Sequence, residues 1–259
     1  MTLLTQMGRL TLLQLRYVNK AFWRNPARAF FTFIFPLMFL VIFTSLLGND
    51  DVHLGAKVVR LSTYYVAAMA TFGVVSACYN NIAMGVAFQR DAGVLKRVNG
   101  TPLPSSSFLG SHVVHAMLVA FLLVVLTATF GTIAYNAQLP TGTALLECIV
   151  MLLLGGAAFC ALGLALTAVI PNADASPAIV NASILPLLFL SGIFIPFTND
   201  TPSWIVWISR IFPIRHFAAG MQAAFIGTEF RWSDVAVVAV WGVAGLLLAV
   251  RFFSWEPRT

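Results

Sequence analysis

The sequence has few charged residues. Only 9% of its 259 residues are charged, whereas 59% are hydrophobic. A soluble globular domain of ordinary composition carries about 25% charged residues. A water-soluble fold of this size would therefore lack the polar side chains needed to cover its surface. This scarcity excludes an ordinary soluble enzyme or binding domain and predicts an integral membrane protein.

Several chemical signatures are also missing. No G-x-x-x-x-G-K-[ST] motif occurs, because none of the three lysines follows a glycine. H-E-x-x-H, G-x-S-x-G and clusters of cysteine with histidine are absent as well. The few cysteines lie scattered in apolar runs, at Cys78, Cys148 and Cys160. They indicate apolar packing rather than a disulfide framework or metal site. The sequence thus predicts no nucleotide, catalytic or metal site on this chain, and no enzyme activity of its own.

What the sequence does contain is a series of long apolar runs. A helix that crosses the hydrocarbon core needs about 20 apolar residues. Continuous runs do not alternate as barrel strands do, so we expect an all-α fold with six transmembrane helices. The predicted spans are 29–47, 64–88, 113–135, 144–170, 178–195 and 235–253. The remaining pieces are the segment 1–28, the loop 89–110, the segment 196–232 and the tail 254–259.

Basic residues set the expected orientation of these spans. Cytosolic loops carry the excess of lysine and arginine, and six spans place both termini on one side. With cytosolic termini, the basic residues inside are Arg9, Arg16, Lys20, Arg24, Arg28, Arg90, Lys96, Arg97, Arg251 and Arg258. The short outer loops hold Lys57 and Arg60. The net charge of +6 then comes mostly from basic residues that set the membrane topology. No soluble basic domain is left to bind nucleic acid. We expect a multi-pass protein of the cell inner (plasma) membrane.

The segment 1–28 has a basic face on a helical projection. Arg9, Arg16 and Lys20 fall close together around the helix axis, and apolar residues occupy the opposite side. We therefore predict an amphipathic helix that lies in the inner membrane interface and contacts lipids, with Pro26 at the turn into the first span. A generic basic juxtamembrane segment is the alternative.

The longest polar stretch on the inner side is FQRDAGVLKRVNGTPLPSSSF, which contains most of the loop 89–110. Residues 89–98 are compatible with a short helix, and the NGTPLP run ends it. The loop is too small for chemistry but large enough to be a docking surface. A solvated connector is the alternative.

The stretch FLSGIFIPFTNDTPSWIVWISRIFPIRHF, residues 189–217, interrupts the hydrophobic pattern after the fifth span. It leaves an apolar run through Pro196, becomes polar for a few residues, and is then aromatic and apolar again. In the orientation given above, this stretch lies at the outer face. It is typical neither of a span nor of an ordinary loop.

A few polar residues occur inside the predicted spans. Asn80 and Asn81 either line a pathway or hydrogen-bond a neighbouring helix. Glu147 faces either a cavity or interfacial water at the outer end of the fourth span. The run GGAAFCALGLA in that span offers small residues at helical spacing, which predicts a close-packed helix face.

Three stretches together resemble the membrane-spanning permease subunits of type 2 ABC exporters. RNPARAFFTFIFPL is similar to their entry into the first span, and QRDAGVLKRVNGTPLP is similar to their cytosolic loop. LSGIFIPF followed by PSWIVWISRIFPIRHF resembles their stretch after the fifth span. The resemblance runs from about residue 10 to 250 and keeps order and spacing. Gln89 departs from it, because the family often has an acid there; Asp91 is the nearest substitute.

The resemblance implies a division of labour that fits the missing nucleotide motif. Two such permeases form the pathway, either two copies of this chain or this chain with a relative. Separate cytosolic ABC ATPase subunits bind ATP and Mg²⁺, so no cofactor is expected on this chain. It also implies that the ATPase docks on the loop 89–110, near the basic face of segment 1–28. The implied docking residues are Arg9, Arg16, Lys20, Arg90, Asp91, Gly93 and Lys96.

The resemblance further implies that the segment 196–232 is re-entrant and caps the pathway from outside. Non-spanning backbone at membrane depth is tolerated only where protein or water covers it. Prolines are expected to end each helical piece, and Trp204 to help seat a short helix in the outer interface. The implied gate residues are Ser191, Gly192, Pro196, Pro202, Trp204, Pro213, Arg215 and His216. A plain amphipathic outer loop is the alternative.

The function expected from this resemblance is ATP-driven export of an amphipathic compound, either drug-like (multidrug export) or lipid-linked. A secondary transporter driven by an ion gradient is the main alternative, although such proteins usually carry ionisable groups near the midplane and internal repeats. A membrane enzyme acting on lipids needs clustered polar groups, which the sequence does not offer. The sequence does not name the substrate.

Overall fold

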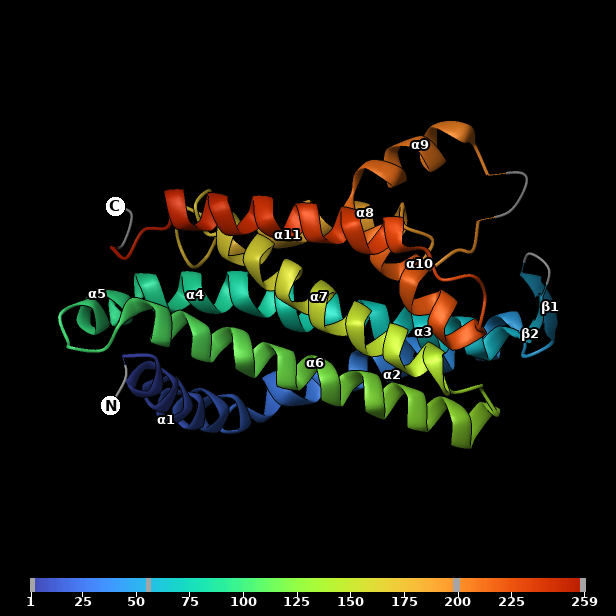
Figure 1. Ribbon diagram of the computed structural model, residues 1–259, viewed down its shortest axis with the longest axis horizontal. Helices are drawn as coiled ribbons and strands as arrows, with labels where there is room; N and C mark the ends of the chain where they lie inside the picture. The colour runs from blue at the N-terminus through green and yellow to red at the C-terminus, as the bar shows by residue number, and fades with distance from the viewer. Residues whose placement is uncertain (1–2, 55–56, 198–200, 257–259) are drawn as a thin grey trace.

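The computed structural model describes residues 3–54, 57–197 and 201–256, which form an elongated bundle of helices (Figure 1). In chain order the elements are α1 (Leu3–Trp23), α2 (Pro26–Leu47), β1 (Asp51–Leu54), β2 (Lys57–Arg60), α3 (Leu61–Val75), the π-helical turn η1 (Ser76–Asn80), α4 (Asn81–Asp91), α5 (Val94–Asn99), α6 (Ser105–Tyr135), α7 (Thr143–Leu166), α8 (Ser176–Phe189), α9 (Ser203–Ile211), α10 (Pro213–Ile226) and α11 (Trp232–Phe252). Helices α1 and α5 and the end of α11 lie at one end of the bundle. The hairpin and α10 lie at the other (Figure 1).

Within the described residues, five helices are long and apolar enough to cross a membrane. They are α2, the continuous helix 61–91 formed by α3, η1 and α4, and the helices α6, α7 and α11. The predicted spans 29–47, 64–88 and 113–135 lie within these helices, whereas 144–170 and 235–253 run past the end of α7 at Leu166 and of α11 at Phe252. The expectation of a mostly helical protein with several spans is therefore confirmed.

The remaining predicted span, 178–195, is not confirmed as a complete span. α8 has 14 residues, so it is about 21 Å long, shorter than the hydrocarbon core of about 30 Å. The helix ends at Phe189, and the chain turns at Gly192, where φ is +81°. Only glycine adopts this backbone conformation readily. Hydrophobicity continues to Ile195, so the sequence did not reveal where the helix stops.

A short β-hairpin between α2 and α3 is a further difference from the all-α expectation. β1 and β2 pair antiparallel, with Asp51 opposite Arg60 and Leu54 opposite Lys57. At its base, the side chain of Asn49 donates to the carbonyl of Tyr135 at 3.0 Å, which ties the hairpin to the end of α6. Four residues per strand are too few for a clear alternating pattern, so the sequence analysis missed it.

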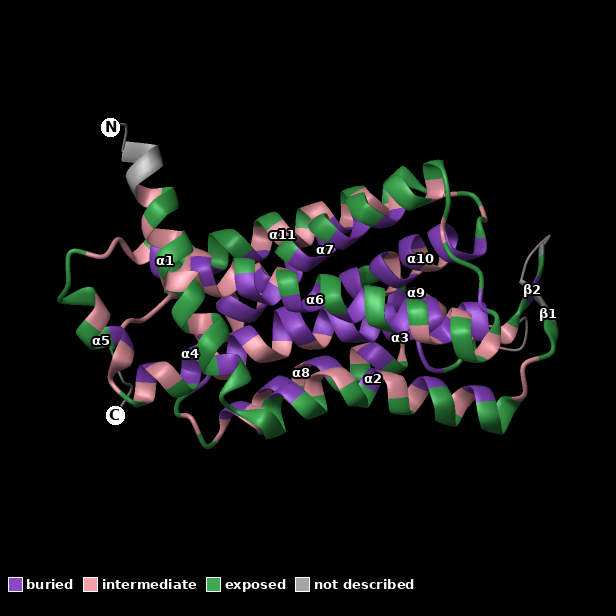
Figure 2. Ribbon diagram, turned by 90° about the horizontal axis from the view of Figure 1, so that it is seen from below, coloured by how far each residue is buried: buried purple, intermediate pink, exposed green. Residues whose placement is uncertain are grey.

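The core follows the continuous helix 61–91. In the most apolar stretch of this helix 83% of the residues are buried, against 17% in α2, which lies at the edge of the bundle (Figure 2). Small residues let α7 approach its neighbours closely. A Cβ at Gly163 would lie 2.8 Å from the carbonyl oxygen of Tyr79, and one at Gly245 of α11 would lie 2.9 Å from the backbone nitrogen of Leu162. The predicted small-residue packing face is thus confirmed.

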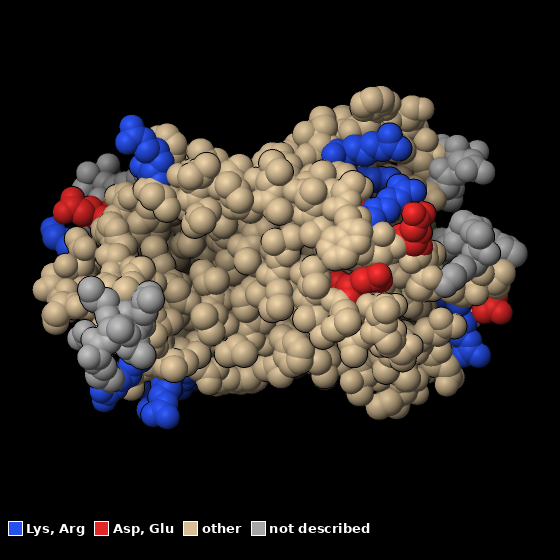
Figure 3. Space-filling model, in the orientation of Figure 1, with Lys and Arg blue, Asp and Glu red and all other residues tan. Residues whose placement is uncertain are grey.

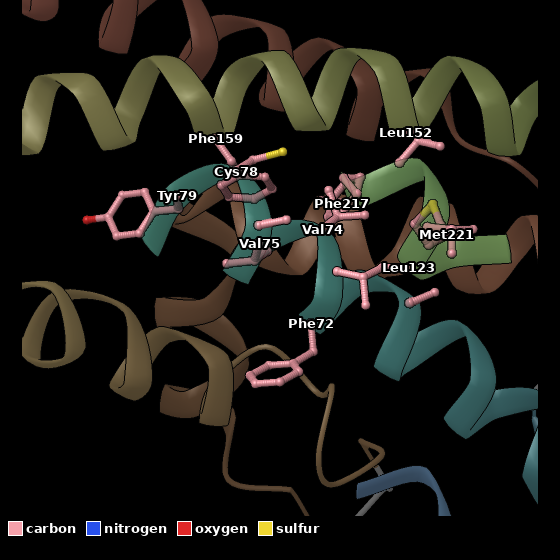
Figure 4. Packing of buried hydrophobic residues seen from close by; sticks show 14 of the residues in the cluster. Phe72, Val74, Val75, Cys78, Tyr79, Leu123, Leu152, Phe159, Phe217 and Met221 are labelled. Carbon is pink, nitrogen blue, oxygen red and sulfur yellow. The ribbon is translucent and has the colours of Figure 1, made fainter. Parts of the chain in front are cut away.

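Helix α10 is inserted into this core although it is too short to span a membrane. It has 14 residues, and Phe217 and Met221 on it are fully buried. The rings of Phe217 and Phe159 lie 5.3 Å apart in an edge-to-face arrangement. Figure 4 shows both α10 side chains among those of α3 and α7. α10 therefore behaves as a part of the helix bundle and not as an outer loop.

Candidate functional site

Charged side chains gather toward the two ends of the bundle. On the face shown in Figure 3, the band between the ends is without lysine, arginine, aspartate or glutamate over most of its width. This distribution is expected of a protein whose middle lies in hydrocarbon and whose ends reach water. The end that carries α1 and α5 holds the predicted docking residues, and the end that carries α10 holds the predicted gate. We call them the α1 end and the α10 end.

At the α1 end, Arg90 is the best-anchored charged residue. Its side chain is only 1% exposed, although the sequence analysis placed it on a surface loop. Its Nη1 donates to the carbonyl of Thr167 at 2.9 Å, and its Nη2 to the carbonyls of Ile170 at 2.6 Å and Pro171 at 3.4 Å. These carbonyls lie at and just after the C-terminus of α7, where backbone acceptors lack helical partners. Arg90 therefore cannot reach a partner protein directly in this conformation, and any part it plays in docking is indirect.

Asp91 makes a further contact between the end of α4 and the segment that follows α7. A carboxylate oxygen of Asp91 accepts a hydrogen bond from the backbone nitrogen of Ala173, in the connection between α7 and α8. Its other oxygen lies 3.8 Å from Nε of Arg90. The neighbouring Gln89 does not join them, because its Nε2 lies 3.0 Å from Nε2 of His112 on α6. The end of α4 thus holds the α7–α8 connection by two adjacent side chains, and we call these contacts the α4 clamp.

Helix α5 follows the α4 clamp directly and faces outward. Gly93 makes the turn between α4 and α5 with φ of +68°, a left-handed conformation that favours glycine. Leu95 is fully buried and anchors α5, whereas Lys96 is exposed. On α1, the residues Arg9, Arg16 and Lys20 are exposed as well. The structure therefore presents four predicted docking residues to the outside at one end of the molecule.

At the α10 end, the turn after α8 is held by two tyrosines of α3. The hydroxyl of Tyr64 donates to the carbonyl of Gly192, and the hydroxyl of Tyr65 donates to the carbonyl of Phe194 at 3.4 Å. Ser191 is buried and donates to the carbonyl of Leu188 at 2.7 Å. The backbone carbonyls that leave α8 thus find partners inside the bundle, as buried polar groups must.

His216 connects three helices at this end. Its Nδ1 lies 2.5 Å from the carboxylate of Asp234 on α11, and its Nε2 lies 2.9 Å from the carbonyl of Arg210 on α9. Both partners are acceptors, so both contacts are hydrogen bonds only when each ring nitrogen carries a proton. Trp241 of α11 adds a bond from Nε1 to the carbonyl of Ile211 at 2.9 Å. Sequence reasoning singled out His216 but gave no signal for Asp234, which is distant in the chain.

Arg215 lies beside His216 but is held much more loosely. Its guanidinium carbon is 4.1 Å from the ring centroid of Phe197, and it lines a cavity of about 180 Å³ together with Tyr64, Ser191 and Gln222. Burial, aided by the charge of Arg210, lowers the pKa of Arg215 below its usual value. Within the described part of the chain, Nη1 of Arg215 and Nε2 of Gln222 have no hydrogen-bond partner.

Of the three prolines of the predicted gate, only Pro213 ends a helical piece as expected, because α9 ends at Ile211 and Phe212, just before the proline, is extended. α8 ends before Pro196 is reached, so this proline does not terminate it. Pro202 immediately precedes α9, and Pro213 is the first residue of α10, a position that suits its fixed φ. Trp204 and Trp207 are exposed, at 60% and 69%, and the seat of Trp204 in a membrane interface stays a prediction. Residues 198–200 of the predicted re-entrant segment lie outside the described residues.

The predicted pathway residues are not brought together. Asn81 accepts a long hydrogen bond of 3.5 Å from Arg28, Oδ1 of Asn80 is buried, and Glu147 is partly exposed near the start of α7. Among the described residues, no hydrogen bond or ion pair joins these three. The π-helical turn at 76–80 instead supports a contact that the sequence did not suggest. The hydroxyls of Tyr79 and Ser183 lie 2.9 Å apart and link this helix to α8.

Comparison with known proteins gives two concordant results. The sequence model of the family described as ABC-2 type transporter matches residues 10–226. A protein of Porphyra purpurea named as transport permease ycf38 is 24% identical over 221 residues, which cover 85% of this chain and 75% of that protein. Its namesake in Pyropia yezoensis is 23% identical over the same shares of both chains.

Proposed function

Because the chain belongs to the ABC-2 type transporter family, whose model covers residues 10–226, we propose that it is the permease subunit of an ATP-driven exporter. Membership makes it a multi-pass transport component rather than a catalytic domain, and implies association with an ABC ATPase. In the proposal, this separate subunit binds ATP and Mg²⁺ and supplies the energy, and the permease moves the compound out of the cell.

The observation that carries this proposal is the α4 clamp. Exposed Lys96 on α5 lies a few residues from Arg90, which is bonded to carbonyls at the end of α7. Asp91 adds a hydrogen bond to the connection that leads into α8. A force applied to α5 by an ATPase would therefore pass to α7 and α8 through hydrogen bonds, with no need for a flexible connection.

α8 is the element best suited to convert that force into opening. It is short, it is linked to α4 at its beginning, and the turn that follows it is held by Tyr64 and Tyr65 at the α10 end. A shift of α8 would strain and break those two hydrogen bonds, so that the turn after α8 could move. The outer segment with α9 and α10 then acts as the gate.

A second permease is the proposed partner for α2. Only 17% of its most apolar stretch is buried in the single chain, and Phe30 and Phe31 are among its exposed side chains. On α8, Phe189 is exposed as well. Lipid covers such faces in a monomer, whereas a second permease covers them in a dimer whose interface forms the pathway.

The proposed substrate is amphipathic, and we infer this from a groove at the side of the bundle. A cavity of about 320 Å³ lies among α7, α8, α10 and α11. Its wall is apolar for the most part and includes Phe159 and Trp241, with the Tyr79 and Ser183 hydroxyls as polar points. A compound with an apolar body and a small polar group fits such a wall.

The test is co-purification of the chain with its ATPase. The chain is isolated from its native membrane in a mild detergent, bound proteins are identified by mass spectrometry, and ATP hydrolysis is assayed. Lys96→Glu reverses an exposed charge on α5 and is expected to remove most of the bound ATPase. Arg251→Glu is the matched control, because Arg251 is exposed at the same end of the bundle but on α11 instead of α5.

Two outcomes would contradict the proposal. Equal loss of the ATPase in both variants would show that α5 is not the docking surface. Absence of any ATPase in several mild detergents, together with transport that stops when the proton gradient is dissipated, would identify a secondary transporter instead.

A further inference from the structure

A third cavity lies at the α1 end, behind the N-terminal helix. Its volume is about 250 Å³, and residues of α1, α2, η1, α4 and α6 line it. Most of the wall is apolar. The polar side chains on it include Arg28 at the start of α2, Asn81 and Gln89 on α4, and His112 and His115 on α6. Neither aspartate nor glutamate is among the residues that line it.

His115 is the unusual member of this wall. It is 8% exposed, and neither of its ring nitrogens has a hydrogen-bond partner among the described residues. A buried polar group without a partner costs free energy, so a ligand that supplies the partner is favoured. The neighbouring His112 shows the ordinary arrangement, since its two nitrogens lie 3.0 Å from the Phe108 carbonyl and 3.0 Å from Gln89.

Arg28 supplies a positive charge to the same cavity. Its Nη2 donates to Oδ1 of Asn81 at 3.5 Å, and its guanidinium lies 5.6 Å from the ring centroid of Phe22. The Phe22 ring also meets the His115 ring, with centroids 5.1 Å apart. Phe22 therefore organises Arg28 and His115 around one apolar ring. A guanidinium is well suited to a phosphate, because its planar donors match two phosphate oxygens.

We propose that this cavity binds the phosphate headgroup of an anionic phospholipid. The positive charge and the absence of acidic residues on its wall select an anion, and the unpartnered imidazole offers one further hydrogen bond. The apolar wall and the position behind α1, whose Tyr17 is exposed and also lines the cavity, suit the attached acyl chains. Bound lipid would join α1 and α2 to the helices of the core. This site does not depend on the proposed export function.

The experiment measures lipid binding to the full chain, purified in mild detergent with whatever subunits accompany it. Native mass spectrometry records the occupancy by dioleoyl phosphatidylglycerol and by dioleoyl phosphatidylcholine, which has the same chains and no net charge. We expect tighter binding of phosphatidylglycerol. Arg28→Gln should weaken it about tenfold, the usual effect of losing a charged hydrogen bond. Arg24→Gln removes an equal, exposed charge that does not line the cavity, and serves as the control.

His115→Leu gives an independent readout. Because it removes an unpartnered polar group, this variant should unfold at the same or a higher temperature without added lipid, yet gain less from phosphatidylglycerol than the native chain. A variant that merely damaged packing would lose stability in both conditions. Equal binding of the two lipids, or equal effects of Arg28→Gln and Arg24→Gln, would overturn the proposal. Displacement of phosphatidylglycerol by millimolar inorganic phosphate would also overturn it, since that result identifies a site for a free anion.

Discussion

Arg90 and Arg215 lie in opposite ends of the bundle and are held in different ways. Arg90 is 1% exposed and makes hydrogen bonds to three backbone carbonyls. Arg215 lies over the face of Phe197, and one of its terminal nitrogens has no hydrogen-bond partner among the described residues. The first side chain fixes one arrangement of the helices, whereas the second leaves its surroundings free to rearrange.

The difference shows what each end of a transport protein needs. Backbone carbonyls at a helix C-terminus carry partial negative charge, so a guanidinium there satisfies acceptors and complements the helix dipole. Such a contact between two helices is suited to transmitting a displacement from one helix to the other. A single cation–π contact contributes about 0.5–2 kcal/mol, less than hydrogen bonds to three carbonyls, so it can break and re-form. We therefore expect the α1 end to be rigid and the α10 end to move.

Arg90→Ala is expected to have the largest effect. It removes three hydrogen bonds and leaves carbonyls at the end of α7 without partners, which should lower the free energy of unfolding by about 3 kcal/mol or more. Thermal unfolding of the purified chain in detergent measures the change. In the assembled transporter, ATP hydrolysis should persist while transport falls, because the α4 clamp no longer connects α5 to α7.

The control for this prediction is Arg97→Ala on the neighbouring helix. Arg97 is exposed and donates to the Ala92 carbonyl at 3.2 Å, so its removal should cost no more than about 0.5 kcal/mol. Equal destabilisation by the two substitutions would mean that Arg90 is not the anchor of the α1 end.

The His216–Asp234 pair should give an intermediate effect. His216→Ala removes the contacts with Asp234 and with the Arg210 carbonyl, and we expect a loss of about 1–2 kcal/mol. The double-mutant cycle with Asp234→Ala should show a coupling of about 1 kcal/mol, because the two side chains are in direct contact. Strict additivity of the two substitutions would show that the contact contributes nothing to holding α9, α10 and α11 together.

The long spans could be predicted from the sequence because hydrocarbon thickness constrains length and composition directly. Residues 113–135 are mostly apolar, and α6 runs from Ser105 to Tyr135. The end of α8 could not be predicted, since the residues beyond Phe189 remain apolar while the turn depends on a glycine and on bonds to α3. The hairpin at 51–60 was missed because strands of four residues carry too weak a pattern.

The sequence likewise predicted the placement of some functional residues and not of others. Lys96 and the basic residues of α1 are exposed, as a charged loop and a basic helical face predict. Arg90 reads as a surface charge in the sequence, because its partners are backbone carbonyls that lie about 80 positions later, and the sequence has no signal for them. Asp234 and Tyr79 were missed for the same reason. Contacts between distant helices depend on packing, which local patterns do not encode.

Arg215→Gln should have the smallest effect on stability, within about 0.5 kcal/mol. The lost contact with Phe197 is offset in part, because burial, aided by the charge of Arg210, already disfavours the Arg215 cation, as its lowered pKa indicates. The proposed gate should nevertheless open more readily. A cysteine introduced by Ser191→Cys, in the same cavity, should then react faster with a membrane-impermeant thiol reagent in the Arg215→Gln background.

The native cysteines, which are all buried, give a low background for this measurement. Arg210→Gln is the matched control, since it removes a nearby charge without changing the residues that line the cavity. If Arg215→Gln destabilises the chain as much as Arg90→Ala, the two ends are equally rigid and the contrast with Arg90 is lost. If stability is kept and the reaction rate at position 191 does not change, Arg215 is not part of the gate. A faster reaction in Arg215→Gln alone would place the movable contact at Phe197, because only that substitution removes it.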